Sequence, residues 1–132
     1  MSETRQYRLL IVDDESAVSE SLSAFFSDFG LTPQTAASAE AGLKLVETTK
    51  FDLAVVDIRL PDHNGDHFIL QAHRLQPAMK FIVHTGSVHY QITEEISRTG
   101  ITPEDIFLKP IIDLQKLYDR VMSILHAENK NA

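Results

Sequence analysis

Four short apolar runs and one weaker strand-like segment, separated by segments with helical periodicity, constrain the fold of this chain most strongly. The predicted strands are Tyr7–Val12, Leu31–Ala36, Phe51–Asp57, Met79–His84 and Ile106–Leu108. A run without polar alternation, such as that in the third segment, is typical of a strand buried on both faces of a parallel sheet. Strands that alternate with helices imply right-handed crossovers and helices on both faces. The pattern therefore predicts an α/β fold.

Five helices are expected between and after these strands, at about Glu15–Phe29, Ser38–Thr48, Asp66–Gln76, Tyr90–Arg98 and Asp113–His126. Ser38 and Asp66 are predicted N-caps, and Gly30 is a predicted C′ residue. Pro33 makes the second strand an edge strand, because proline cannot donate to a ladder. We expect residues 1–132 to form a single domain, with a core over about residues 7–126 and a polar tail at each end.

Composition excludes several function classes. The net charge of −7 without a Lys/Arg cluster argues against direct binding of nucleic acid. The chain contains no cysteine, which excludes disulfides and thiolate metal sites. No apolar run approaches the roughly 20 residues of a membrane span, and the polar N-terminus has no signal-peptide core. The expectation is a cytoplasmic protein that does not contact the membrane.

Three carboxylates stand at strand ends: Asp13 and Asp14 after the first strand, and Asp57 after the third. In a flavodoxin-like (βα)5 doubly wound parallel sheet with strand order 2-1-3-4-5, these two strands are neighbours at the switch point. The carboxylates would then converge, repel one another and favour a bound cation, and Mg²⁺ suits such oxygen ligands. Alternatively, Asp13 and Asp14 cap the first helix and Asp57 only begins a turn.

Two further residues end strands at the same edge. Lys109 follows the fifth strand, and its ammonium could pair with Asp57 or with a phosphoryl group on it. Thr85 follows the fourth strand and could donate its hydroxyl to a phosphoryl oxygen. A lone lysine is more often a solvated surface charge, and a threonine at a strand end is more often a cap or turn residue.

Four motifs in order along the chain give a specific resemblance. They are Leu10–Glu15, Val56–Gly65, Thr85–Gly86 and Lys109–Pro110. Together they resemble the receiver domain of two-component response regulators, of the CheY-like type. The resemblance implies a signalling module that accepts a phosphoryl group from a sensor histidine kinase or a phosphotransfer protein. It implies no conventional enzyme activity, since such a domain catalyses only its own phosphorylation and slow dephosphorylation.

The resemblance also implies a role for each matching residue. Asp57 would be the phosphoacceptor, a carboxylate nucleophile that attacks phosphorus. Asp14 would ligate Mg²⁺ directly, Asp13 mostly through water, and the backbone carbonyl of Arg59 would be a further ligand. Asp57 would complete the metal site.

Lys109 would hold the phosphoryl group, and Thr85 would turn inward to bond it. That movement would switch the face formed by the fourth helix, fifth strand and fifth helix. The Lys109–Pro110 bond is expected to be cis. The output domain or target protein is unknown from the sequence, and dimerisation through the switched face stays open.

The chain departs from the receiver pattern in two places. Ile106 stands where the family usually has Tyr or Phe, three residues before the lysine, and strand alternation sends Phe107 to the opposite side. We therefore expect switching without an aromatic rotamer change. The connection Gly100–Asp105 is about two residues longer than usual, and its start resembles a helix N-terminus, although a tight turn into the fifth strand is favoured.

Three alternatives to a receiver domain are possible from the sequence. A phosphatase of the haloacid dehalogenase type needs a second aspartate two residues after the nucleophile, where this chain has Arg59. A pseudo-receiver that binds a partner without phosphorylation stays open because of Ile106. His63 and His67 could suggest a metal site, but without cysteine or a second matching pair we interpret them as coincidence.

Overall fold

The computed structural model describes residues 6–130, with side chains described for residues 6–127. Its five strands form one parallel sheet in the order β2-β1-β3-β4-β5. The strands are β1 (Arg8–Val12), β2 (Thr32–Ala36), β3 (Leu53–Val56), β4 (Lys80–Thr85) and β5 (Ile106–Leu108). The predicted α/β class, flavodoxin-like topology and strand order are confirmed, and β2 is an edge strand as Pro33 indicated.

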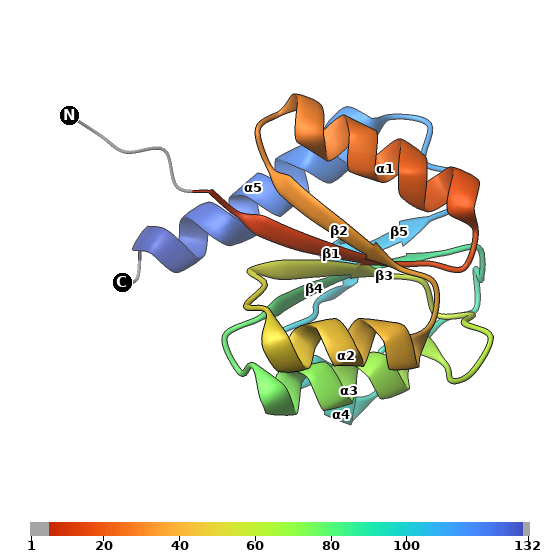
Figure 1. Ribbon diagram of the computed structural model, residues 1–132. Coiled ribbons are helices and arrows are strands. Elements are labelled where there is room, and N and C mark those ends of the chain that lie inside the picture. The colour runs from red at the N-terminus through yellow and green to blue at the C-terminus, as the bar shows by residue number, and fades with distance from the viewer. Residues whose placement is uncertain (1–5, 131–132) are drawn as a thin grey trace.

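The helices cover both faces of the sheet (Figure 1). They are α1 (Ser16–Asp28), α2 (Ala39–Thr48), α3 (Gly65–Leu75), α4 (Glu94–Ser97), the 3₁₀ turn η1 (Pro103–Asp105) and α5 (Leu114–Lys130). In Figure 1, α1 and α5 lie on one face, and α2, α3 and α4 lie on the other. Within residues 6–130, no helix has the length and apolarity needed to cross a membrane.

Alternation along the strands divides the hydrophobic core into two layers. On β1, Leu10 and Val12 pack into the α2–α3–α4 layer, while Leu9 and Ile11 pack into the α1–α5 layer. All four side chains have no exposed area, as expected for a parallel sheet covered on both sides. The alternation of side chains along each strand therefore determines which core layer each residue joins. The same alternation determines which face of the sheet a residue just beyond a strand end approaches.

Local signals at helix ends were mostly correct. The Ser38 side chain accepts a hydrogen bond from the Ala41 N–H, and Gly30 has a φ of +82° after α1. The predicted cap Asp66 is wrong: α3 begins two residues earlier, with Asn64 as its N-cap. The Asn64 side chain accepts from the His67 N–H at 2.9 Å, which leaves Asp66 inside the first turn.

The predicted helix Tyr90–Arg98 is also too long, because α4 is a single turn over Glu94–Ser97. The Thr93 side chain accepts from the Ile96 N–H and so starts the helix there. Tyr90 serves a tertiary contact instead, since its hydroxyl donates to Asp66 on α3 at 2.7 Å. Tertiary bonding therefore overrides a weak local helix preference.

Two segments near the end of the chain, the connection before β5 and the last turns of α5, need comparison with the prediction. The connection before β5 contains the 3₁₀ turn, stabilised by a capping box between Thr102 and Asp105. The helix-start signal there was therefore genuine, although the turn leads directly into β5 as favoured. α5 continues to Lys130, so the predicted end of the last helix at about His126 is too early.

Two large hydrophobic residues near helix ends are partly exposed. Phe29 retains 45% exposure and Leu75 retains 50%. Phe29 is the C-cap of α1, and its ring packs on Tyr118 of α5 with centroids 4.4 Å apart. Helical spacing identifies a face, but the last turn of a helix extends beyond the edge of the core.

Candidate functional site

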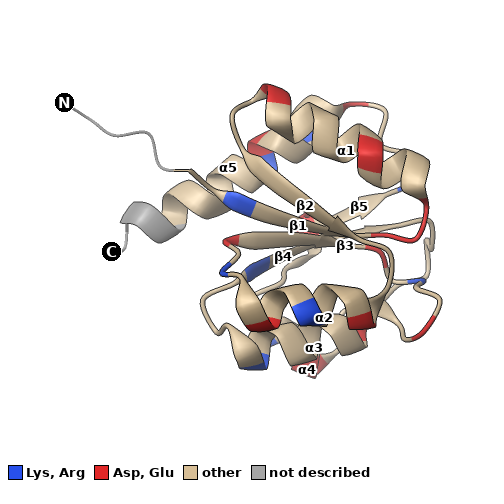
Figure 2. Ribbon diagram, viewed as in Figure 1, with Lys and Arg blue, Asp and Glu red and all other residues tan. Residues whose placement is uncertain are grey.

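Acidic side chains gather where β1 and β3 end. These strands are paired in parallel, with Val12 opposite Val56, so the next residues emerge side by side. One carboxylate oxygen from each of Asp13, Asp14 and Asp57 lies within 4.8 Å of the others. In Figure 2 acidic segments follow the carboxyl ends of these strands. Among residues 6–127, no other group of three histidine or acidic side chains comes as close.

The members of this acidic trio differ in burial. Asp13 and Asp57 are 3% and 5% exposed, whereas Asp14 is exposed to solvent. Burial raises the pKa of Asp13, and the charge of Asp57 raises it further. Hydrogen bonds from the Glu15 N–H and Lys109 lower this pKa, but they do not cancel the effect of burial. Two buried carboxylates thus face an exposed third one, which leaves an entrance from solvent on the Asp14 side.

Lys109 neutralises part of this negative charge. Its Nζ lies 2.9 Å from Asp13 Oδ2, 3.0 Å from Asp57 Oδ2 and 2.7 Å from Glu15 Oε1. Burial lowers the pKa of Lys109, but the bonds with Glu15, Asp13 and Asp57 outweigh it, so the pKa lies above its ordinary value. The ammonium is therefore permanently charged beside Asp57. The Lys109–Pro110 peptide is cis, as predicted.

The end of β4 brings Thr85 to the same edge. The side chain is fully buried, and its Oγ1 accepts a hydrogen bond from the Ser87 N–H at 3.1 Å. The Lys109 N–H donates to the Thr85 carbonyl at 2.8 Å, which ties β4 to the residue after β5. The hydroxyl proton of Thr85 has no acceptor among the described residues and is available to a ligand.

Arg59 lies in the loop that leaves β3. Its backbone N–H donates to Asp57 Oδ1 at 3.2 Å, and the residue forms a bridge with Asn64. The Arg59 side chain is exposed. The loop nevertheless folds back on the trio, since a backbone donor reaches the Asp57 carboxylate.

Three residues near the site were not assigned a role from the sequence. Glu15 contributes the third carboxylate on Lys109, and its position directly after the Asp-Asp pair could have indicated this. Gly65 packs against the backbone of Asp57, where an added Cβ would lie 2.5 Å from the Asp57 carbonyl oxygen. His84 is buried before Thr85, and both ring nitrogens lack a hydrogen-bond partner. No local sequence pattern indicates the tertiary contacts of Gly65 and His84.

The predicted orientations of Ile106 and Phe107, on opposite sides of β5, are confirmed. Ile106 packs against the α2–α3–α4 layer, and Phe107 packs against the α1–α5 layer. No aromatic side chain from β5 therefore stands on the Ile106 side, where strand parity also places Thr85. His63 and His67 lie outside the acidic trio, with their rings stacked 4.1 Å apart.

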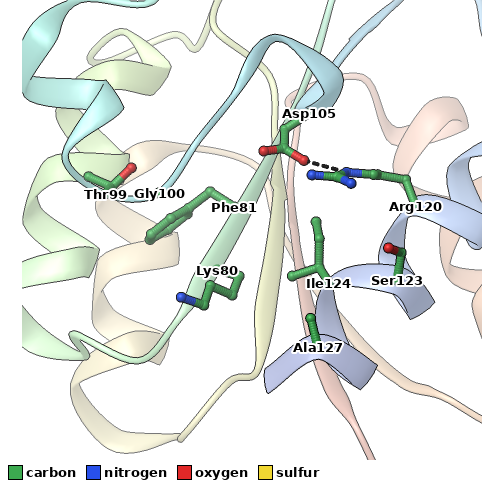
Figure 3. Close-up of a pocket in the computed structure, with 9 residues that line it drawn as sticks. All are labelled: Lys80, Phe81, Thr99, Gly100, Asp105, Arg120, Ser123, Ile124 and Ala127. Carbon is green, nitrogen blue, oxygen red and sulfur yellow. Dashed lines mark hydrogen bonds and ion pairs between the residues drawn. The ribbon is translucent and has the colours of Figure 1, made fainter. Parts of the chain in front are cut away.

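A separate hollow lies at the opposite end of the sheet, between the start of β4, η1 and α5 (Figure 3). Its volume is about 290 Å³, and it is lined by Lys80, Asp105 and Arg120, among other residues. Asp105 is buried and accepts a hydrogen bond from Arg120 Nε at 2.7 Å. Asp105 and Arg120 thus pair with each other in this hollow, which is remote from the acidic trio.

Comparison with solved structures gives the same fold. A CheY-like receiver domain protein from Methanospirillum hungatei JF-1 superposes with a TM-score of 0.83 at 31% identity, over 97% of this chain and 100% of that one. A response regulator protein from Thermotoga maritima, solved with Mg²⁺ and a beryllofluoride group, gives a TM-score of 0.78 at 24% identity, over 90% of this chain and 99% of that one.

Curated relatives are similar over part of their length. The Regulator of RpoS from Escherichia coli K12 is 28% identical over 125 residues, which is 95% of this chain and 36% of that protein. The alginate biosynthesis transcriptional regulatory protein AlgB from Pseudomonas aeruginosa is 30% identical over 106 residues, or 80% of this chain and 23% of that protein. This chain spans half or less of the length of these curated relatives.

The family assignment rests on the whole core. The sequence model described as the response regulator receiver domain matches residues 9–122, which contain the acidic trio, Thr85 and Lys109. Such a domain is part of two-component signalling and is not a conventional enzyme. With the fold, the acidic pocket and Lys109 all in agreement, this chain belongs to the response regulator receiver domain family.

Proposed function

We propose that this receiver domain accepts a phosphoryl group on Asp57 from the phosphohistidine of a sensor histidine kinase or a phosphotransfer protein. The observation that carries the proposal is the position of Asp57 Oδ2, 3.0 Å from Lys109 Nζ and within the acidic trio. A carboxylate placed between a cation and a potential metal site can attack a phosphoryl group, because charge on the phosphate is neutralised on both sides.

Mg²⁺ is the proposed cofactor, and the donor set fits it. Three carboxylates within 4.8 Å offer hard oxygen ligands, and their mutual repulsion favours a divalent ion. We assign Asp13, Asp14, Asp57 and the backbone carbonyl of Arg59 as the residues that hold it. The ion would neutralise developing charge on the transferred group. The similar protein from Thermotoga maritima was solved with Mg²⁺, which supports this assignment.

The transfer itself requires little covalent assistance from the protein. A carboxylate oxygen of Asp57 forms a bond to phosphorus while the phosphorus–nitrogen bond of the donor histidine breaks, and the electron pair returns to the imidazole. Lys109 is already within bonding distance of Asp57 Oδ2, so its ammonium would pair with the phosphoryl oxygens. Thr85 would then donate its free hydroxyl proton to one of those oxygens.

The consequence would be a switch at the face formed by α4, β5 and α5. Thr85 lies at the end of β4, which is paired with β5, so its movement would reach that face directly. Because Ile106 and not an aromatic residue stands on the same side, we propose coupling without an aromatic rotamer change. We also propose that residues 1–132 form a single domain with a core over about residues 7–126, and that the switched face contacts an output domain, a target protein or a second copy of the chain.

Intact-mass analysis after incubation with acetyl phosphate tests the proposal. Wild-type protein should gain one phosphoryl group with Mg²⁺ and none with excess chelator. Asp14→Asn should slow the reaction by removing a metal ligand, whereas Asp28→Asn, which changes an exposed carboxylate on α1, should react like wild type. If wild-type protein gained no phosphoryl group from acetyl phosphate or from any histidine kinase tested, the domain would be a pseudo-receiver that signals by binding alone.

A further inference from the structure

We propose that His63 and His67 form a second metal site, which chelates a divalent first-row transition ion such as Zn²⁺. Their rings are stacked with centroids 4.1 Å apart and an interplanar angle of 24°. Neither ring makes a hydrogen bond to another residue within 6–127. The site lies outside the acidic trio and takes a different class of metal, because imidazole nitrogen suits Zn²⁺, Ni²⁺ and Cu²⁺ better than Mg²⁺.

The backbone holds the two imidazoles together before any metal binds. His63 precedes the N-cap of α3, and His67 lies in the first turn, four residues later. The cap bond from the His67 N–H to the Asn64 side chain fixes the relation between loop and helix. Two imidazoles on one tetrahedral zinc have ring centres roughly 5 Å apart, given zinc–nitrogen bonds of about 2.0–2.1 Å. Two stacked rings cannot both direct a nitrogen at one ion, so coordination would require both side chains to rotate as well as to move apart.

Acidic side chains of α2 provide further ligands. A hollow of about 380 Å³ is lined by both histidines together with Glu40, Glu47 and Lys44. Within residues 6–127, the Glu40 carboxylate makes only an exposed ion pair with Lys44 at 3.8 Å, which is weak and leaves the carboxylate able to turn. In the present rotamers neither glutamate is close enough to complete a three-residue group. Rotation of Glu40 or Glu47 would supply the third ligand, and water the fourth.

The site would connect two elements that already meet. Asp62, next to His63, accepts hydrogen bonds from the N–H groups of Ala39 and Glu40 at the start of α2. An ion shared by the two histidines and a glutamate of α2 would add a second connection between that helix and the loop that leaves Asp57. Stacking of two uncoordinated imidazoles is the competing explanation of the same geometry.

Isothermal titration with Zn²⁺ distinguishes the two explanations. The titration uses the full chain at pH 7.5 with Mg²⁺ in excess, so that the acidic trio is occupied. We expect one Zn²⁺ per chain, with affinity reduced roughly tenfold or more in both His63→Gln and His67→Gln. The control, His89→Gln, changes an exposed histidine that does not line this hollow, and it should bind zinc like wild type.

Asp14→Asn separates this site from the proposed magnesium site. Zinc binding that persists in Asp14→Asn and is weakened by both histidine variants supports the chelate. The proposal fails if wild-type protein binds no zinc, if either histidine is dispensable, or if binding is lost only with Asp14→Asn. Circular dichroism and urea unfolding of each variant ensure that a loss of affinity is not a loss of fold. None of these outcomes depends on phosphorylation of Asp57.

Discussion

Gly65 shows how one residue without a side chain can shape the site. A Cβ at this position would lie 2.5 Å from the Asp57 carbonyl oxygen and 2.8 Å from Ile58 Cα. Both neighbours are backbone atoms, so they cannot give way by rotating a side chain. Gly65 also opens α3 directly after the Asn64 cap. The close approach therefore sets the path of the loop between Asp57 and α3.

We predict that Gly65→Ala lowers the free energy of unfolding by about 1–3 kcal/mol, as expected for overpacking against backbone. It should also slow phosphorylation, because relief of the clash displaces Asp57. The control is Gly86→Ala, since an added Cβ there meets nothing within 4 Å. Urea denaturation measures the stability of both variants. Equal stability of the two would show that the loop has more freedom than the contact indicates.

His84 introduces a pH dependence of stability. Burial lowers its pKa from 6.5 to about 4, with a smaller contribution in the same direction from the charge of Lys109. Between these values the unfolded chain binds the proton and the folded chain does not, so stability falls as pH falls. At about 1.4 kcal/mol for each pKa unit, the loss reaches at most about 3 kcal/mol.

Urea unfolding of wild type and His84→Leu across pH 4 to 7.5 tests this interpretation. We predict a shallower loss of stability in the variant on the acid side of pH 6.5, because leucine does not titrate. At pH 7.5 the variant should be at least as stable as wild type, since two unpartnered buried nitrogens are removed. Carboxylates titrate in both proteins and largely cancel in the difference. Parallel curves of stability against pH for the two proteins would mean that folding does not change the pKa of His84.

At the level of elements, strand ends were predicted better than helix lengths. Each apolar run stops at a polar residue, and those stops placed Asp13, Asp57, Thr85 and Lys109 at one edge. The length of α4 depends instead on the bond between Tyr90 and Asp66, 24 residues apart in the chain. Local periodicity contains no information on such a bond. The neighbours of Lys109 were partly predicted, because Asp57 follows from topology, whereas Glu15 requires knowledge of side-chain direction.

A short ion pair joins η1 to α5. Asp105 is buried, and Arg120 is its charged partner at 2.7 Å (Figure 3). Removing the arginine leaves a buried carboxylate bonded only to Thr102. We predict that Arg120→Met lowers the free energy of unfolding by about 3 kcal/mol, typical of an uncompensated buried charge.

The matched control is Arg98→Met. Arg98 also pairs with an acidic residue, Glu94, at 2.6 Å, but both side chains are more than two-thirds exposed. Such a pair contributes no more than about 0.5 kcal/mol. Chemical denaturation of the two variants compares a buried ion pair with an exposed one on the same domain. If Arg120→Met cost no more than Arg98→Met, the buried ion pair would contribute no more to stability than the exposed one.

For the whole molecule, topology followed from the alternation of strands and helices, because parallel strands and right-handed crossovers leave few arrangements. The two-layer core then followed from strand parity, as Leu9 and Leu10 illustrate. What the sequence did not contain was the close packing around the acidic trio, including Gly65 and His84. These contacts join residues from different elements, and only the assembled fold brings them together.

The central claim is that Asp57, and no other carboxylate of the trio, receives the phosphoryl group. The most direct test is intact-mass analysis of Asp57→Asn after acetyl phosphate and Mg²⁺ treatment, beside Asp113→Asn as a carboxylate variant outside the trio. We predict one phosphoryl group on wild type and on Asp113→Asn, and none on Asp57→Asn. A phosphoryl group that persists on Asp57→Asn at the wild-type level would contradict the assignment and move the acceptor to another side chain.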